Sequence, residues 1–289
     1  MMNENTRLRG LRWCLEVGWK HLFAVVMMIF CIFPLLYVLS ASLNPGGTLT
    51  GSNQLFNNVS FQNYVELFGK DFPKWMMRSF YVSSVSAIGT VLMAAAAAYA
   101  FSRFRFTGRR SGLTALLIIQ MFPQMLAFIA IYLLLLTLQD IFPALGLGSP
   151  LGLIAVYLGG ALGANTFLMY GFFNTIPKEL DEAARIDGAT HAQIFWGVIM
   201  RLVTPILAVV GLLSFVGTYG DFILAKIVLQ RPEDYTLAVG LYVWASDERN
   251  ALWSLFAAGA VVAAIPIILL FMYLQKYIVS GLTAGAVKG

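Results

Sequence analysis

Charged side chains are scarce in this sequence. Asp, Glu, Lys and Arg together make up 11% of its 289 residues, and hydrophobic residues make up 59%. Soluble domains usually carry about 25% charged residues, so this composition excludes an ordinary soluble domain. Cysteine and histidine are rarer, with two of each. The cysteines have no CxxC or metal-ligand spacing, and we interpret the isolated His21 and His191 as interfacial residues rather than ligands.

Sequence motifs for chemistry are missing as well. The chain contains no G-x-S-x-G, no H-E-x-x-H and no GxxxxGK[ST] phosphate loop. We therefore predict no catalytic residue, no metal site and no cofactor bound by this chain. The net charge of +5 comes from basic residues dispersed along the sequence, which argues against nucleic-acid binding.

Long apolar runs dominate what is present. They cover residues 22–43, 79–102, 111–139, 151–173, 202–229 and 251–275, and the fifth is interrupted only by Asp221 and Lys226. A helix needs about 20 apolar residues to cross a bilayer, whereas barrel strands alternate over about ten. We predict an all-α integral membrane protein with six transmembrane helices. The first run exceeds the 7–15-residue core of a signal peptide, so we expect it to be retained.

The distribution of Lys and Arg predicts the orientation. Six spans place both termini on one side, and thirteen of the 19 basic residues fall there: Arg7, Arg9, Arg12, Lys20, Arg103, Arg105, Arg109, Arg110, Lys178, Arg185, Arg201, Lys276 and Lys288. Cytoplasmic loops carry the excess of positive charge. We expect both ends and the segment around residue 180 to be cytoplasmic.

Residues 178–187, KELDEAARID, form the densest group of charges. Pro177 suits the first position of a helix, and the acids that follow favour its N-terminus. Gly188 suits the left-handed residue after a helix, and Thr190 with Gln193 forms a capping box for a second helix. The sequence therefore predicts a helix, a glycine bend and a helix that continues into the fifth span.

One face of the first predicted helix would hold small and apolar residues flanked by acids: Leu180, Ala183, Ala184 and Asp187. Such a face suits a groove on another protein. The alternative is a solvated helix on the membrane surface. An acid-rich helix suits an anionic membrane poorly, which favours the protein partner.

The stretch EAARIDGA resembles the EAA loop of binding-protein-dependent ABC importer permeases. AYAFSRFRFTGRR (98–110), QMFP (120–123), YLGG (157–160), YTLAVGLY (235–242) and SGLTAGAVKG (280–289) resemble the maltose/maltodextrin-type permease subunits among them. The resemblance implies a type I ABC importer fold with an extracytoplasmic segment 1–74, a transmembrane domain 75–280 and a tail 281–289. Segment 1–74 would also include the cytoplasmic N-terminus and the first span.

The resemblance also implies the partners. They would be a second permease subunit, a homodimeric ATPase that binds ATP and Mg, an external sugar-binding protein, the oligosaccharide and the bacterial cytoplasmic membrane. The EAA loop, about 177–201, would couple to the ATPase through Leu180, Glu182, Ala183, Ala184, Asp187 and Gly188. The tail would reach the ATPase interface through Gly285, Val287, Lys288 and Gly289. Two departures stand out: Met200-Arg201 replaces the usual Leu-Pro pair, and Arg78-Ser79 replaces Asn-Ser.

Ionisable residues inside a span are functional candidates. Asp221 lies about sixteen residues into the fifth run, and Asn165 and Tyr219 could join it along a sugar path. Alternatively, Asp221 pairs with a neighbour or faces external water. A rival function is an ion-driven secondary transporter, which should show buried charge relays and broken helices. A membrane-embedded enzyme is a second rival, but it lacks a motif here.

Overall fold

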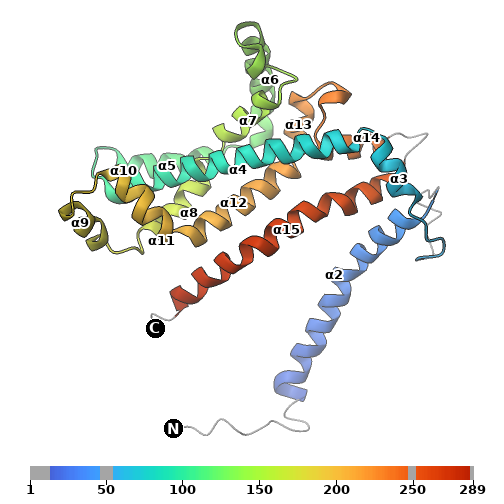
Figure 1. Cartoon of the computed structure of the whole chain (residues 1–289), viewed down its shortest axis with the longest axis horizontal. Helices are drawn as coiled ribbons and strands as arrows, with labels where there is room; N and C mark the ends of the chain where they lie inside the picture. Colours follow the sequence, from blue (N-terminus) through green and yellow to red (C-terminus); the bar gives the residue numbers. More distant parts are fainter. Residues whose placement is uncertain (1–13, 46–54, 247–251, 287–289) are drawn as a thin grey trace. The chain divides into compact units, whose positions relative to one another are not determined.

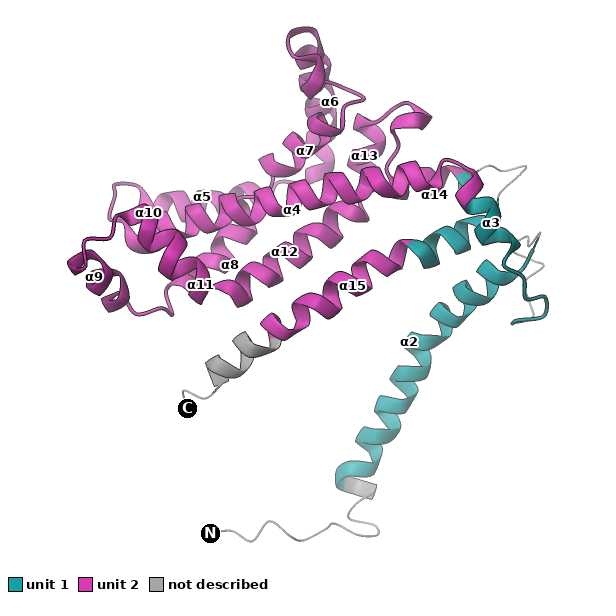
Figure 2. Ribbon diagram, in the orientation of Figure 1, with its two compact units in different colours: residues 1–67, 244–262 teal, residues 68–243, 263–289 magenta. Residues whose placement is uncertain are grey.

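A computed structural model describes residues 14–45, 55–246 and 252–286. It divides the chain into two compact units, residues 1–67 with 244–262 and residues 68–243 with 263–289 (Figure 2). Each unit is described by itself. Every element assigned over the described ranges is helical, which confirms the predicted all-α class.

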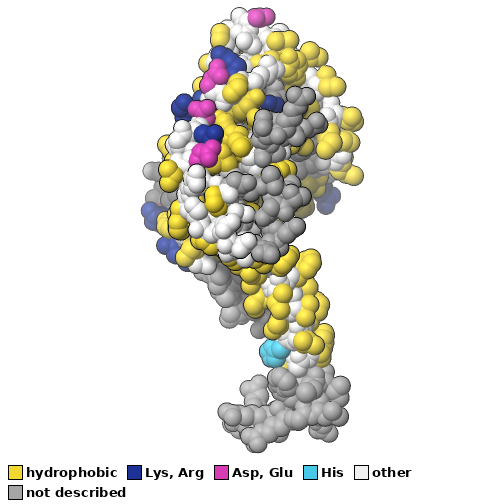
Figure 3. Space-filling model, turned by 90° about the vertical axis from the view of Figure 1, so that its right-hand side faces the viewer, with side chains coloured by type: hydrophobic (Ala, Val, Ile, Leu, Met, Phe, Trp, Pro, Cys, Tyr) yellow, Lys and Arg dark blue, Asp and Glu magenta, His cyan; other side chains and the backbone are white. Residues whose placement is uncertain are grey.

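The first unit contains a short π-helix, η1 (Cys14–Gly18), which leads into α2 (Trp19–Leu43). Large apolar side chains are exposed along α2, and Phe30 is 72% exposed. In Figure 3, α2 leads down to the grey N-terminal residues and its surface is largely hydrophobic. An apolar helix without a polar face is typical of a membrane span.

The C-terminal end of α2 is fixed by polar contacts within the same unit. The Asn63 side chain donates hydrogen bonds to the carbonyls of Ser42 and Asn44, at 2.9 and 3.0 Å. Asn63 lies on α3 (Gln62–Gly69), which confirms the short helix predicted over residues 61–68. These bonds satisfy carbonyls that the end of α2 leaves without a helical partner.

The second unit is built around α4 (Phe72–Arg103). It packs against α12 (Thr204–Tyr219), α8 (Gly163–Phe173) and α7 (Pro150–Gly159), as Figure 1 shows. Alanines at the contact are fully buried: Ala94, Ala95 and Ala98. Small residues let helix backbones approach closely where no hydrophobic drive exists, so the alanine run serves the packing that its composition predicts.

The remaining elements of this unit connect the long helices. They are α5 (Arg109–Gln120), α6 (Gln124–Ile141), η2 (Pro143–Leu145), α9 (Glu179–Ile186), α10 (His191–Gln193), η3 (Ile194–Ile199), α11 (Met200–Leu202), α13 (Ile223–Val228) and η4 (Pro232–Asp234). Two elements have residues in both units: α14 (Leu237–Ser246) and α15 (Trp253–Ala286).

Three predicted spans are interrupted, which corrects the expectation of continuous helices. The run 111–139 is broken between α5 and α6 at Pro123, which lacks an amide and disfavours helix at the residue before it. The run 151–173 bends by 53° between α7 and α8, where its glycines lie. The run 202–229 is broken between α12 and α13 beside Gly220.

Four described helices are long and apolar enough to cross a membrane by length and composition: Glu16–Leu43, Phe72–Arg103, Gln124–Ile141 and Trp253–Ile278. The number rises to six if each of two bent helix pairs is one span. One pair is α7 with α8. The other joins His191–Leu202 to α12 with an angle of 80°. Six spans therefore remain a prediction that this upper count accommodates.

The described end of the chain is helical. We expected the last span to end near Tyr277, but α15 continues to Ala286 and includes Gly285. Val287, Lys288 and Gly289 lie outside the described residues.

The departure at Arg78-Ser79 has a local explanation at the other end of α4. The Arg78 guanidinium lies 3.2 Å from the Asp234 carboxylate and also donates to the Glu233 carbonyl. Ser79 accepts a 2.7 Å hydrogen bond from the backbone N–H of Leu237. Arg78 and Ser79 thus fasten α4 to the loop that carries η4 and to the start of α14.

Candidate functional site

The charged segment folds as predicted into a helix with a glycine bend. The helix α9 begins at Glu179, so Pro177 lies just before it rather than at its first position. Gly188 has φ +84°, in the left-handed region. Its N–H donates to the Arg185 carbonyl and the N–H of Ala189 donates to the Ala184 carbonyl, both at 2.9 Å. This is the Schellman pattern that ends a helix on glycine.

The helix after the bend also begins as predicted. Thr190 accepts from the backbone N–H of Gln193, and the Gln193 side chain accepts from the N–H of Thr190. This capping box satisfies amides that the first turn leaves unpaired. The chain stays helical through α10, η3 and α11 to Leu202, and η3 is a π-helix. The 80° bend before α12 follows directly.

The residues proposed to face an ATPase differ in exposure. Leu180 is 43% exposed, and four others are exposed: Glu182, Ala183, Asp187 and Gly188. Ala184 is half-buried and packs against the core cluster that contains Ile194 and Ile199. The exposed surface of α9 also includes Ile186, which is 87% exposed and which sequence reasoning left out. An exposed isoleucine beside alanine and acids was a signal available in the sequence.

Asp181 turns away from that surface. Its carboxylate lies 2.7 Å from Nε of Arg103, the last residue of α4, and the two side chains are 6% and 3% exposed. A buried carboxylate needs a paired charge. Sequence reasoning grouped Asp181 with the other first-turn acids, because nothing in the local pattern marks it as different.

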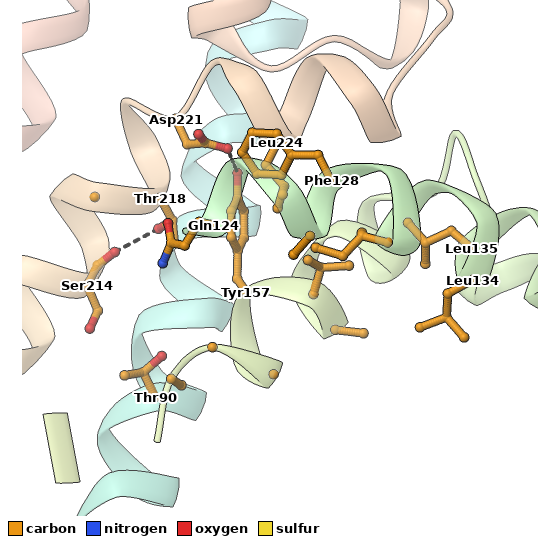
Figure 4. A pocket seen from close by; sticks show the side chains of 18 of the residues that line it. Thr90, Gln124, Phe128, Leu134, Leu135, Tyr157, Ser214, Thr218, Asp221 and Leu224 are labelled. Carbon is orange, nitrogen blue, oxygen red and sulfur yellow. Dashed lines mark hydrogen bonds between the residues drawn. The ribbon is translucent and has the colours of Figure 1, made fainter. Parts of the chain in front are cut away.

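A cavity of about 680 Å³ lies between the helices of the second unit (Figure 4). Apolar residues make up much of its wall, and α6 contributes many of them. Polar side chains also line it: Thr90, Gln124, Tyr157, Asn165, Ser214, Thr218 and Asp221. An apolar wall with a few placed polar groups is the usual form of a small-molecule site.

Asp221 lies in the break between α12 and α13 rather than inside a continuous helix. Its carboxylate accepts a 2.7 Å hydrogen bond from the Tyr157 hydroxyl and a 3.2 Å bond from the N–H of Ala225. Figure 4 shows Tyr157 and Asp221 pointing toward each other. The alternative that Asp221 pairs with a neighbour therefore describes its environment, and it still lines the cavity. Tyr157 is a cavity residue that sequence reasoning missed.

The other two path candidates separate. Asn165 lines the cavity, and its amide donates to the Ala161 carbonyl at 3.0 Å. Tyr219 is buried and stacks on Phe215, with ring centroids 5.4 Å apart, and it is not among the lining residues. The described side chains include no group of His, Cys, Asp and Glu suited to a metal ion.

Residues 87–284 match the family described as the binding-protein-dependent transport system inner membrane component. The chain belongs to this permease family. Among its relatives, the galactooligosaccharides transport system permease protein GanQ of Bacillus subtilis (strain 168) is 41% identical over 274 residues, covering 93% of this chain and 95% of the relative. The maltose/maltodextrin transport system permease protein MalG of Escherichia coli (strain K12) is 38% identical with the same coverage of both chains.

A solved structure resembles the permease in fold. It is a chain from a bacterial ABC transporter involved in the import of the acidic polysaccharide alginate. It matches with a TM-score of 0.78 and 23% identity, over 94% of this chain and 99% of that one. The resemblance to maltose-type permeases is thus confirmed at the level of family and fold.

Proposed function

We propose that this permease moves an oligosaccharide, of the maltose/maltodextrin type or a related neutral sugar, across the bacterial cytoplasmic membrane. The observation that carries the proposal is the identity of 38–41% to permeases named for galactooligosaccharides, maltodextrin and maltose. The cavity supports it. Hydroxyl, amide and carboxylate groups along its wall are hydrogen-bond partners for sugar hydroxyls.

ATP hydrolysis belongs to a partner in this proposal. A homodimeric ATPase binds ATP and Mg, and the exposed surface of α9 enters a groove on it. A second permease subunit and an external sugar-binding protein complete the importer. Both termini are cytoplasmic and six spans cross the membrane. The tail, with Gly285, Val287, Lys288 and Gly289, reaches the ATPase interface. This chain is then a transport subunit without a catalytic residue of its own.

The broken helices favour one rival. Discontinuous spans beside an acid are typical of ion-driven secondary transporters, and Asp221 lies at such a break. Its second ionisable neighbour does not extend into a relay, because Lys226 bonds to the Tyr235 hydroxyl at 2.8 Å. Family membership and an EAA-type loop favour the ATP-driven importer.

The test is sugar uptake by the permease reconstituted in liposomes with its partner permease, ATPase and binding protein. We expect uptake to require ATP and the binding protein, and to persist when an ionophore removes the proton gradient. A panel of maltodextrins, galactooligosaccharides and uronate oligosaccharides then defines the substrate. Uptake that stops with the ionophore and ignores ATP would establish the secondary transporter instead.

Removing the charge of Asp221 should impair sugar passage without affecting assembly. In Asp221→Asn the amide oxygen still accepts from Tyr157, but the stronger bond of a carboxylate to a sugar hydroxyl is lost. Hydrogen bonds to charged groups contribute about 1.5 kcal/mol or more, so we expect roughly tenfold lower uptake at limiting sugar. The matched control is Asp140→Asn, an exposed carboxylate on α6 outside the cavity lining. Equal uptake for both variants and the unaltered complex would remove Asp221 from the path.

A further inference from the structure

Arg103 joins three elements at one end of the second unit. Its Nε faces the Asp181 carboxylate on α9 at 2.7 Å. Its Nη1 donates to the carbonyl of Phe173, the last residue of α8, and its Nη2 donates to the Ile176 carbonyl, both at 3.2 Å. One planar guanidinium therefore holds the end of α4, the end of α8 and the first turn of α9.

The environment of this contact makes it rigid. Both side chains are almost fully enclosed, with 3% exposure for Arg103 and 6% for Asp181. An adjacent bond strengthens the same junction, because the Ser102 hydroxyl donates to the Asn174 side chain at 2.9 Å. A fork of fixed N–H donors fits one arrangement of acceptors, which an ammonium on a flexible stem does not.

The contact also gives α9 a direct connection to the helix at the centre of the unit. Through the backbone alone, α9 connects to α8 on one side and to α10 on the other. Arg103 adds α4, which packs along α12 and α8. These three helices carry Thr90, Thr218 and Asn165 to the cavity wall. A displacement of α9 that reaches α4 thus reaches the cavity.

We propose that Arg103 and Asp181 are a positioning pair that transmits movement of α9 to α4, so that α4, α8 and α9 move together during the transport cycle. The proposal rests on the proposed function, in which α9 docks on the ATPase. It adds the residues through which docking reaches the cavity-lining helices.

The experiment measures sugar imported per ATP hydrolysed in liposomes that contain the complete importer. The first variants are Arg103→Met and Asp181→Leu, singly and together. Each single change leaves a buried charge without its partner, which can impair folding. The double variant avoids this, because well-packed apolar residues commonly replace a buried ion pair without loss of stability.

A positioning role and a structural role predict different results for the double variant. We expect it to assemble with its partners at normal stoichiometry and to hydrolyse ATP, but to import at least fivefold less sugar per ATP. Assembly and a transport ratio equal to those of the unaltered importer would show that the pair serves stability alone, and would overturn the proposal. The control Arg105→Met makes the same chemical change at an exposed residue two positions on, and its ratio should be unchanged.

A conservative variant tests whether the charge itself transmits the movement. Arg103→Lys keeps the attraction to Asp181 but loses the fork that reaches two carbonyls. We expect its sugar-to-ATP ratio to lie between those of Arg103→Met and the unaltered importer. A lysine variant no better than the methionine variant would contradict the proposal. Absence of ATP-dependent uptake by the unaltered importer would refute the proposed function instead, so the two failures are distinguishable.

Discussion

Gly188→Val is expected to lower binding-protein-stimulated ATP hydrolysis to about one-tenth while the complex still assembles. Gly188 has φ +84°, and a side chain there meets no atom within 4 Å. The cost is therefore one of backbone conformation alone. Left-handed backbone costs an L-residue roughly 1–2 kcal/mol, and a β-branched side chain is a pronounced outlier there. The bend between α9 and α10 would relax and misdirect α9.

Two variants separate the bend from general destabilisation. Gly188→Asn should retain most of the stimulation, because asparagine tolerates the left-handed region better than other residues. Gly108→Val carries the same strain elsewhere, since Gly108 has φ +87° and open space around it but lies in the turn before α5. Stimulation and elution on a sizing column are measured for all three. Normal stimulation in Gly188→Val would refute a coupling role for the bend.

Local signals in the sequence predicted this region well. The left-handed glycine, the capping box and the first-turn acids are each determined by a few neighbouring residues, and the structure contains all of them. The apolar runs likewise predicted an all-helical membrane protein, because a bilayer leaves the backbone few alternatives. These features depend on chain-local geometry and on the solvent, and both can be read without knowing the tertiary contacts.

The corrections concern features set by distant residues or by the balance between neighbouring helices. Asp181 is buried because Arg103 lies opposite it, and the two are far apart in the chain. The pattern ELDE does not indicate which acid faces inward. Hydropathy is similarly blind to the breaks at Pro123 and Gly220, since both occur within apolar runs. As a result, Asp221 was placed inside a helix, whereas it lies at a break and accepts a bond from Tyr157.

Reversing the charge of Glu182 should disrupt docking of the ATPase. Glu182 is exposed on α9 near the exposed Ala183 and Ile186, where the proposed partner groove presents a basic rim. In Glu182→Lys two positive charges would meet as water is excluded, and like charges brought together at an interface cost several kcal/mol. We expect the amount of ATPase that co-purifies with the permease to fall more than tenfold.

Graded variants and salt show whether charge is the cause. Glu182→Gln removes the attraction without adding repulsion, so it should retain more ATPase than Glu182→Lys. Salt screens exposed charges over about 10 Å at 0.1 M, so raising it should weaken the unaltered complex more than the glutamine variant. Asp140→Lys reverses an exposed charge on α6 and should leave co-purification unchanged. If Glu182→Lys binds the ATPase at full stoichiometry and still transports sugar, Glu182 is only a solvated residue of α9.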